Sequence, residues 1–235
     1  MKQSIVRIDL DGVNSYLLKE GDNFLLIDTG GHVLREKDHS IKRNKLEDQL
    51  DKAGVGPENL RLLIITHGDI DHTANASYIR EKYKTKIAMH KNDLALVKTA
   101  ELGNILSNFK LKSPMLKVVF RLMKGSINKT FKKMLEDYEP FEPDFFIDEG
   151  FSLQDYGFHA KVLHIPGHTA GSIGILSESG DLISGDIFAN TGKPGFAPNA
   201  LDFDQMEASA KRLKKMNIKM VYPGHGSPFE ANMLK

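Results

Sequence analysis

Cysteine and tryptophan are absent from this chain of 235 residues. Without cysteine the protein can form neither disulfides nor thiolate-ligated zinc sites. The net charge is also close to zero, +1 at pH 7 with histidine neutral, which predicts no general affinity for nucleic acid or membrane surfaces. No run approaches the roughly 20 apolar residues of a membrane span, and residues 1–10 lack the apolar stretch of a signal peptide. We therefore expect a cytoplasmic protein without a membrane span.

A hydrophobic content of 40% in 235 residues is sufficient for one sizeable core. Short runs rich in leucine and β-branched residues predict strands, and apolar residues at helical spacing predict helices between them. Predicted strands cover 13–18, 24–28, 60–65, 86–90, 151–156, 160–165, 172–176 and 182–186, and predicted helices cover 46–53, 74–83 and 203–216. This alternation predicts an α/β fold, which we expect to form a single domain over residues 1–235.

Four metal-binding side chains follow the predicted strand at 60–65 within six positions: His67, Asp69, Asp71 and His72. Imidazole nitrogens and carboxylate oxygens are ligands of borderline and hard divalent metals. A short bent segment can aim alternate side chains at two points, so His67 and Asp69 could share one metal and Asp71 and His72 another. The alternative interpretation is that Asp71 caps the helix that follows, with two incidental histidines nearby.

Three further candidate ligands lie downstream, each directly after a glycine. They are His168 in Pro-Gly-His-Thr-Ala-Gly-Ser, Asp186 in Ser-Gly-Asp-Ile and His225 in Pro-Gly-His-Gly. Glycine permits positive φ and close backbone approach, so each ligand is expected on a tight turn at the end of a strand. Together with the first motif, the sequence offers seven candidate metal ligands.

The order of these ligands resembles that of the metallo-β-lactamase superfamily. In that family a loop of histidines and an aspartate precedes a histidine in Gly-His-Thr-x-Gly-Ser, a bridging aspartate in Gly-Asp and a late Gly-His. The early segments 14–18 and 26–30 also match, so the resemblance covers about residues 5–228. It implies an αββα sandwich of two stacked mixed β-sheets with outer helices, and a pair of metals at one edge. It also implies that Asp28 lies near the metals and orients a ligating histidine, although Asp28 could equally accept from the amides of its own glycine turn.

Asp69 departs from the family pattern, which has a histidine at this position. A related replacement by glutamate occurs in the flavodiiron oxygen and nitric-oxide reductases. Three carboxylates and a hydroxide would carry four negative charges against four positive charges from two divalent ions. We therefore expect two divalent ions, zinc first, with iron or manganese favoured by the extra carboxylate. The alternative is that Asp69 is too short to reach a metal.

The resemblance implies a hydrolase in which a hydroxide held between two metals attacks an ester, thioester or lactone of a small molecule. Asp71 would be a metal ligand and a candidate proton acceptor. Two other functions stay open at this point: a diiron oxygen or nitric-oxide reductase that needs a separate electron donor, and a phosphodiesterase.

Residues 93–150 are the part that the family pattern explains least, and they are interpreted as a helical, basic and apolar insertion. Between residues 107 and 135 there are eight basic residues and no acidic residue. Three interpretations compete: a lid or substrate wall over the site, a membrane-surface or partner patch that could form a homodimer contact, and a helical layer with a solvated face.

Overall fold

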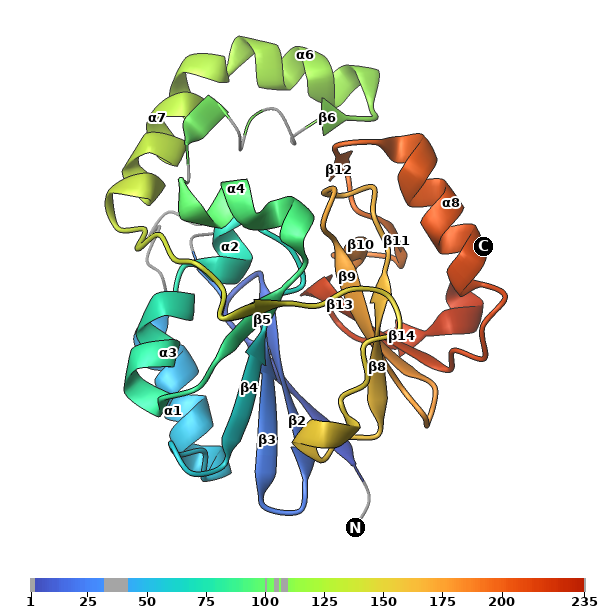
Figure 1. Ribbon diagram of the computed structural model, residues 1–235. Helices are drawn as coiled ribbons and strands as arrows, with labels where there is room; N and C mark the ends of the chain where they lie inside the picture. The colour runs from blue at the N-terminus through green and yellow to red at the C-terminus, as the bar shows by residue number, and fades with distance from the viewer. Residues whose placement is uncertain (1–2, 32–41, 100, 104–105, 107–109, 235) are drawn as a thin grey trace.

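Two β-sheets packed face to face form the centre of the protein, with helices on their outer faces (Figure 1). The computed structural model describes residues 3–31, 42–99, 101–103, 106 and 110–234. The layers run from helices through the first sheet and the second sheet to a final helix, which is the predicted αββα sandwich.

The first sheet contains six strands. In spatial order they are β1 (Ser4–Asp9), β2 (Asn14–Glu20), β3 (Asn23–Ile27), β4 (Leu60–Ile64), β5 (Ile87–Met89) and β7 (Phe145–Phe146). The pairs from β1 to β3 are antiparallel, and those from β3 to β7 are parallel. Parallel pairing on this side places the ends of β3, β4 and β5 at one edge of the sheet, where the candidate ligands follow β4.

The second sheet is built around two long strands that run parallel to each other. Its spatial order is β14 (Phe229–Glu230), β13 (Met220–Gly226), β10 (Asp181–Asn190), β9 (Ile173–Ser177) and β8 (Ala160–His164), with β11 (Gly195–Phe196) added to β10. A separate two-stranded sheet pairs β6 (Lys110–Leu111) with β12 (Asn199–Ala200).

Strand β4 is buried on both of its faces. Leu62 and Ile64 belong to the core between the two sheets, whereas Leu63 belongs to the core under the outer helices, and all three side chains are fully buried. Successive side chains of a strand point to opposite faces. A nearly continuous aliphatic run is therefore what a central strand of this sandwich requires.

The outer helices bury one apolar face each. On the first sheet lie α1 (Arg43–Ala53) and α3 (Ala76–Tyr83), whereas α8 (Phe203–Leu213) covers the second sheet. Apolar side chains of α4 (Leu94–Lys98) and α7 (Lys124–Glu136) join the core under α1 and α3. Two further helices are α2 (Ile70–Thr73) and α6 (Pro114–Leu122), and three short 3-10 turns are η1 (Lys91–Asp93), η2 (Gln154–Tyr156) and η3 (Ala231–Met233).

The predicted strand at 151–156 is wrong. Residues Gln154–Tyr156 form the turn η2, and only Ser152 makes an isolated bridge, to Lys161. Gly157 ends this turn in the left-handed conformation, and Leu153 closes the end of the inter-sheet core. The apolar side chains of this segment therefore pack against the end of the inter-sheet core beside a turn. Strand β1 was not predicted.

Segment 93–150 contains α4, α6 and α7 together with the short strands β6 and β7; residues 100, 104–105 and 107–109 of it lie outside the described residues. Figure 1 shows α6 and α7 as an arch over the end of the sandwich, above α4 and β12. Over the described part of the chain, no helix has both the length and the apolar character needed to cross a membrane.

Candidate metal centre

The structure brings all seven sequence-predicted ligands together at one end of the sandwich. Four of them lie in or after a strand, and three lie in or directly before the short helix α2. His67 follows β4, Asp69 precedes α2, Asp71 and His72 lie in α2, His168 follows β8, Asp186 lies in β10 and His225 lies in β13. Gly224 allows the backbone of β13 to lie close to the Asp186 side chain, because a Cβ at this position would be 2.0 Å from Asp186 Oδ1.

Three of the ligands form one cluster. His168 Nε2 lies 3.1 Å from Asp69 Oδ2, and His67 Nε2 lies 3.7 Å from the same oxygen. Within this trio the candidate ligand atoms are all within 4.8 Å of one another, which is the spacing expected when three ligands surround one cation. Asp69 therefore reaches the point that the two histidines face.

A second cluster contains Asp71, His72 and His225. His225 Nε2 lies 3.3 Å from Asp71 Oδ2, and the three ligand atoms again lie within 4.8 Å of one another. The motif loop thus supplies two residues to each cluster: His67 and Asp69, before α2, go to the first cluster, and Asp71 and His72, within α2, go to the second.

Asp186 lies between the two clusters. Its Oδ2 is 3.1 Å from His225 Nε2 and 3.8 Å from His168 Nε2, while its Oδ1 is 3.4 Å from His72 Nε2. One carboxylate thus faces histidines of both clusters, which is the position of a bridging ligand.

All four histidines present Nε2 to the centre, because their Nδ1 atoms are hydrogen-bonded to other groups. The Thr66 hydroxyl donates to Asp28, so its oxygen accepts from His67. With hydrogen at each Nδ1, the Nε2 atoms keep the lone pairs that a metal needs. The acceptors are Thr66 Oγ1 for His67 at 2.9 Å, Asp28 Oδ2 for His72 at 2.8 Å, Asn199 O for His168 at 3.1 Å and Gly12 O for His225 at 2.5 Å.

Three buried atoms in the centre have no hydrogen-bond partner. They are His67 Nε2, His72 Nε2 and Asp186 Oδ1. Buried polar atoms are nearly always paired, so three unpaired buried atoms in one centre indicate a site for cations that accept their lone pairs. Four neutral Nε2 atoms and three carboxylates fit two divalent cations in number and in chemistry.

The electrostatics of the cation-free centre agree with this assignment. Burial, together with the neighbouring His72 and His168, holds the pKa of His67 well below its usual value. At His168 burial also opposes the charged form, but the hydrogen bond and the charge of Asp69 outweigh it and raise the pKa to about 9. Burial opposes ionisation of Asp186, yet the charges of His225 and His72 hold its pKa well below the usual value. Without a cation, His72, His168 and His225, whose pKa values are raised by the neighbouring carboxylates, balance the negative charge by taking up protons, whereas His67 stays neutral.

Asp28 is oriented by the centre and not by its own glycine turn. Its Oδ2 accepts from His72 Nδ1 at 2.8 Å and from Thr66 Oγ1 at 2.7 Å, and its Oδ1 accepts from Thr66 N at 2.7 Å. The side chain is buried, and the backbone takes the left-handed conformation with φ of 58°. Asp28 therefore fixes the ring of His72.

Sequence reasoning missed Asp93, a buried aspartate that joins two ligand loops. Its Oδ2 accepts from Gly68 N at 2.9 Å and from Thr169 Oγ1 at 2.6 Å, and its Oδ1 accepts from Gly171 N at 2.7 Å. Burial raises its pKa above the usual value, against these hydrogen bonds. No local motif marks the residue, because its partners are distant in sequence.

His90, Asp148 and His164 form a further group outside the centre. The two imidazole rings stack with centroids 4.2 Å apart, and His90 Nε2 lies 3.3 Å from Asp148 Oδ1. His90 Nδ1 accepts from Asn92 N at 3.2 Å, which places the ring hydrogen at Nε2. That tautomer offers Asp148 a donor and leaves no free lone pair for a metal, so we interpret this group as structural.

The fold and the ligand cluster together define a class of protein, the metal-dependent hydrolases built on a ββ sandwich. Residues 8–225 match the family model described as the metallo-beta-lactamase superfamily. The chain belongs to this superfamily, and it is a metal-dependent hydrolase.

Several relatives have curated names. The chain is 28% identical over 91% of its length to a probable metallo-hydrolase of Methanocaldococcus jannaschii, covering 87% of that protein. It is 27% identical over 91% of its length to the hydroxyacylglutathione hydrolase GloC of Haemophilus influenzae, covering 84% of it. A beta-lactamase-like protein 2 homolog of Caenorhabditis elegans is 25% identical over 92% of the chain, which spans 57% of that longer protein.

Solved structures share the fold at low sequence identity. A di-iron-bound form of TTHA1623 superposes with a TM-score of 0.66 at 22% identity, over 98% of this chain and 96% of that one. At this identity the likeness shows the fold alone.

Proposed function

We propose that this protein hydrolyses an ester, thioester or lactone of a small molecule with two divalent cations in the centre described above. One cation would be held by His67, Asp69 and His168, and the other by Asp71, His72 and His225, with Asp186 between them. The observation that carries the proposal is the set of unpaired buried atoms at His67, His72 and Asp186 within the group of candidate ligands. The GloC relative supports a thioester among the three bond types.

When bound, a pair of divalent cations activates water and polarises a carbonyl group near neutral pH. The protein side chains then have separate tasks. Asp28, Asn199 and Gly12 hold histidine rings in the ligating tautomer. Burial opposes ionisation of Asp71, but the charge of His72 and the contact with His225 lower its pKa in the cation-free centre, so its carboxylate is ionised and available as a ligand. Its role as a proton acceptor is part of the proposal.

Asp69 bears on the identity of the metal. It is 3.1 Å from His168 Nε2, which supports ligation over the alternative that the side chain is too short. A third carboxylate lowers the net positive charge of the loaded centre and favours harder cations. We propose zinc as the first candidate, with iron or manganese as alternatives, and the di-iron form of a protein with the same fold supports iron.

Metal analysis of the purified protein, followed by a substrate panel, tests the proposal. We expect two metal ions per chain, and turnover of a thioester or lactone that is lost with a chelator and restored by zinc, manganese or iron. A metal content near zero in the presence of excess zinc would refute the ligand assignment. Turnover of phosphodiesters alone would favour the phosphodiesterase alternative, and an iron absorption band that responds to oxygen without any hydrolysis would favour the reductase alternative.

The homodimer contact through residues 93–150 stays a prediction. Helix α6 supports it, because Met115, Val118 and Leu122 are spaced along one side of the helix and are 71%, 59% and 81% exposed. Light scattering of the wild type and of Leu122→Glu tests it. We expect a dimer that the substitution converts to monomer; a monomeric wild type would refute the contact.

A further inference from the structure

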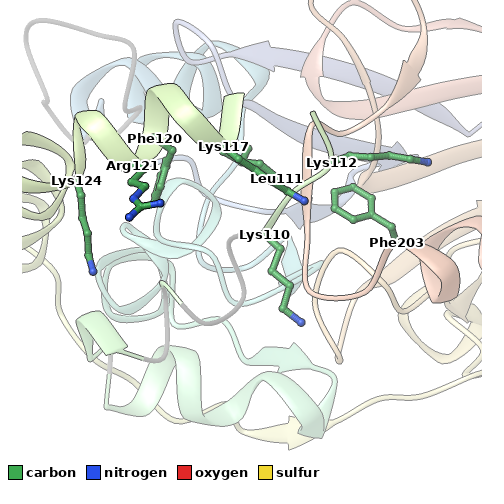
Figure 2. A pocket seen from close by; sticks show the side chains of 8 residues that line it. All are labelled: Lys110, Leu111, Lys112, Lys117, Phe120, Arg121, Lys124 and Phe203. Atoms are coloured by element: carbon green, nitrogen blue, oxygen red, sulfur yellow. The ribbon is translucent and has the colours of Figure 1, made fainter. Parts of the chain in front are cut away.

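A groove lies beside α6, outside the metal centre. Its volume is 590 Å³, which is within the range of roughly 300–1,000 Å³ for small-molecule sites. Figure 2 shows its lining side chains, which come from the segment around β6, from α6, from the first residue of α7 and from the first residue of α8. One continuous segment, residues 110–124, and the distant residue Phe203 therefore build the groove.

The groove is lined by five cationic side chains and by no carboxylate. One of them is already paired, because Lys112 Nζ lies 2.7 Å from Glu207 Oε1 on α8. Among the described residues, none of the other four is in an ion pair with an acidic side chain. Four cations without counter-charges in one concavity are a site for an anion with several charges. The five cations are Lys110, Lys112, Lys117, Arg121 and Lys124.

Apolar side chains form the remaining wall. They are Leu111 of β6, Phe120 of α6 and Phe203 at the start of α8, and Lys112 Nζ lies 5.7 Å from the Phe203 ring centroid. A solvated helix face would leave its cations apart from one another and from aromatic rings. This groove therefore suits a molecule that carries both phosphate groups and an apolar or planar part.

The groove is linked directly to the metal centre. Leu111 pairs with Asn199 across the β6 and β12 strands, and the Asn199 carbonyl accepts from His168 Nδ1 at 3.1 Å. Leu201 N also donates to the His168 carbonyl at 2.8 Å, two residues before Phe203. A molecule bound in the groove therefore lies on the same strand pair that orients a candidate ligand.

We propose that this groove binds the phosphorylated part of the substrate, so that the substrate is a thioester or ester whose leaving thiol or alcohol carries several phosphate groups. This inference rests on the proposed hydrolytic function. In the reaction with a thioester, water adds its oxygen to the acyl carbon and the carbon–sulfur bond breaks. The products are the carboxylic acid and the thiol, which takes up the proton.

Two thioesters with the same acyl group test the groove. Butyryl-coenzyme A carries three phosphate groups, and butyryl-N-acetylcysteamine carries none. The test variant is Lys117→Gln with Arg121→Gln, and the matched control is Lys132→Gln with Lys133→Gln on α7, which removes two exposed cations outside the groove. An exposed ion pair contributes about 1.4- to fivefold, so the test variant, which removes two cations, should lose about 2- to 25-fold in kcat/KM for the coenzyme A thioester.

The neutral thioester and the control variant should show no such loss. Equal kcat/KM for both thioesters in the wild type, or an equal loss in the test and control variants, would overturn the groove inference and leave the hydrolase proposal intact. Hydrolysis of neither thioester would count against the hydrolase proposal instead. In that case, calorimetric binding of coenzyme A decides the groove: weaker binding by the test variant supports it, and equal binding overturns it. Stronger competition by a single-stranded oligonucleotide than by coenzyme A would also overturn it.

Discussion

Substitution of Asp28 by asparagine should weaken metal binding without a change in the shape of the side chain. Asparagine tolerates the left-handed backbone that Asp28 adopts, so the turn is retained. The carboxylate, however, accepts from three donors, two on Thr66 and one on His72. An amide has only one acceptor oxygen, so its NH2 group must face either the Thr66 amide or the ring of His72.

Each orientation has a cost. If the NH2 group faces Thr66 N, two buried hydrogen-bond donors face each other without an acceptor, which costs about 1–3 kcal/mol. If the NH2 group faces His72 Nδ1 instead, that nitrogen must accept a hydrogen bond. The ring hydrogen then moves to Nε2, and the lone pair that faces Asp186 is lost. Loss of such an orienting partner typically lowers metal affinity by about 10- to 100-fold, or about 1.4–2.7 kcal/mol.

Competition with a fluorescent chelator measures the zinc affinity. Asp22→Asn is the matched control, because it makes the same chemical change at an exposed residue of the turn between β2 and β3. Circular dichroism should show that both variants fold. If Asp28→Asn retained the zinc affinity of the wild type within about twofold, the claim that Asp28 orients His72 for ligation would be refuted.

Three other predictions follow from the same geometry. Asp69→His should raise the ratio of zinc to iron bound from a mixed-metal medium, because it removes a hard ligand; an unchanged ratio in elemental analysis would contradict this. The zinc affinity should rise by at least about tenfold per pH unit between pH 7 and 9, because zinc must displace the proton of His168, whose pKa in the cation-free protein is about 9. The pKa values of His72 and His225 are raised as well, so their protons add to the slope; a flat chelator titration would contradict the prediction. Gly224→Ala should lower the metal content per chain, because its Cβ would lie 2.0 Å from Asp186 Oδ1; full metal content in a folded variant would show that the loop can shift.

The central strands were predictable because burial on both faces leaves a strong signal. Leu62, Leu63 and Ile64 are three consecutive aliphatic residues, whereas a strand with one solvent-exposed face would alternate apolar and polar residues. The segment 151–156 has similar apolar residues, but there they close the end of the core from a turn. Phe151 and Leu153 pair with β8 through backbone hydrogen bonds, and the chain then turns at Gln154–Tyr156, so the local pattern does not show where the pairing ends. The single domain over residues 1–235 and the cytoplasmic location stay predictions.

The candidate ligands were also predictable, since their side-chain chemistry and the adjacent glycines are visible in the sequence. Which of these ligands lie beside one another depends on the three-dimensional fold. The sequence indicated which residues of the motif could pair, but only the structure shows His168 beside Asp69 and His225 beside Asp71. Asp93 left no signal, because it acts by accepting from Gly68, Thr169 and Gly171, and an aspartate that accepts from backbone amides resembles any loop aspartate in sequence.

The role of the basic residues in segment 93–150 can be inferred only from the positions of its strands and helices. Eight basic residues between 107 and 135 are compatible with a solvated helix, a membrane patch or a substrate wall. The pairing of β6 with β12 separates these interpretations, because it places Lys110 and Leu111 beside the start of α8 and under α6. The cations then face a concavity next to the strand that holds His168, whereas a membrane patch would present them together with Val118 and Leu122 on the exposed side of α6. The charge and the apolar face of α6 point in different directions, and this separation favours a substrate wall on the inner side.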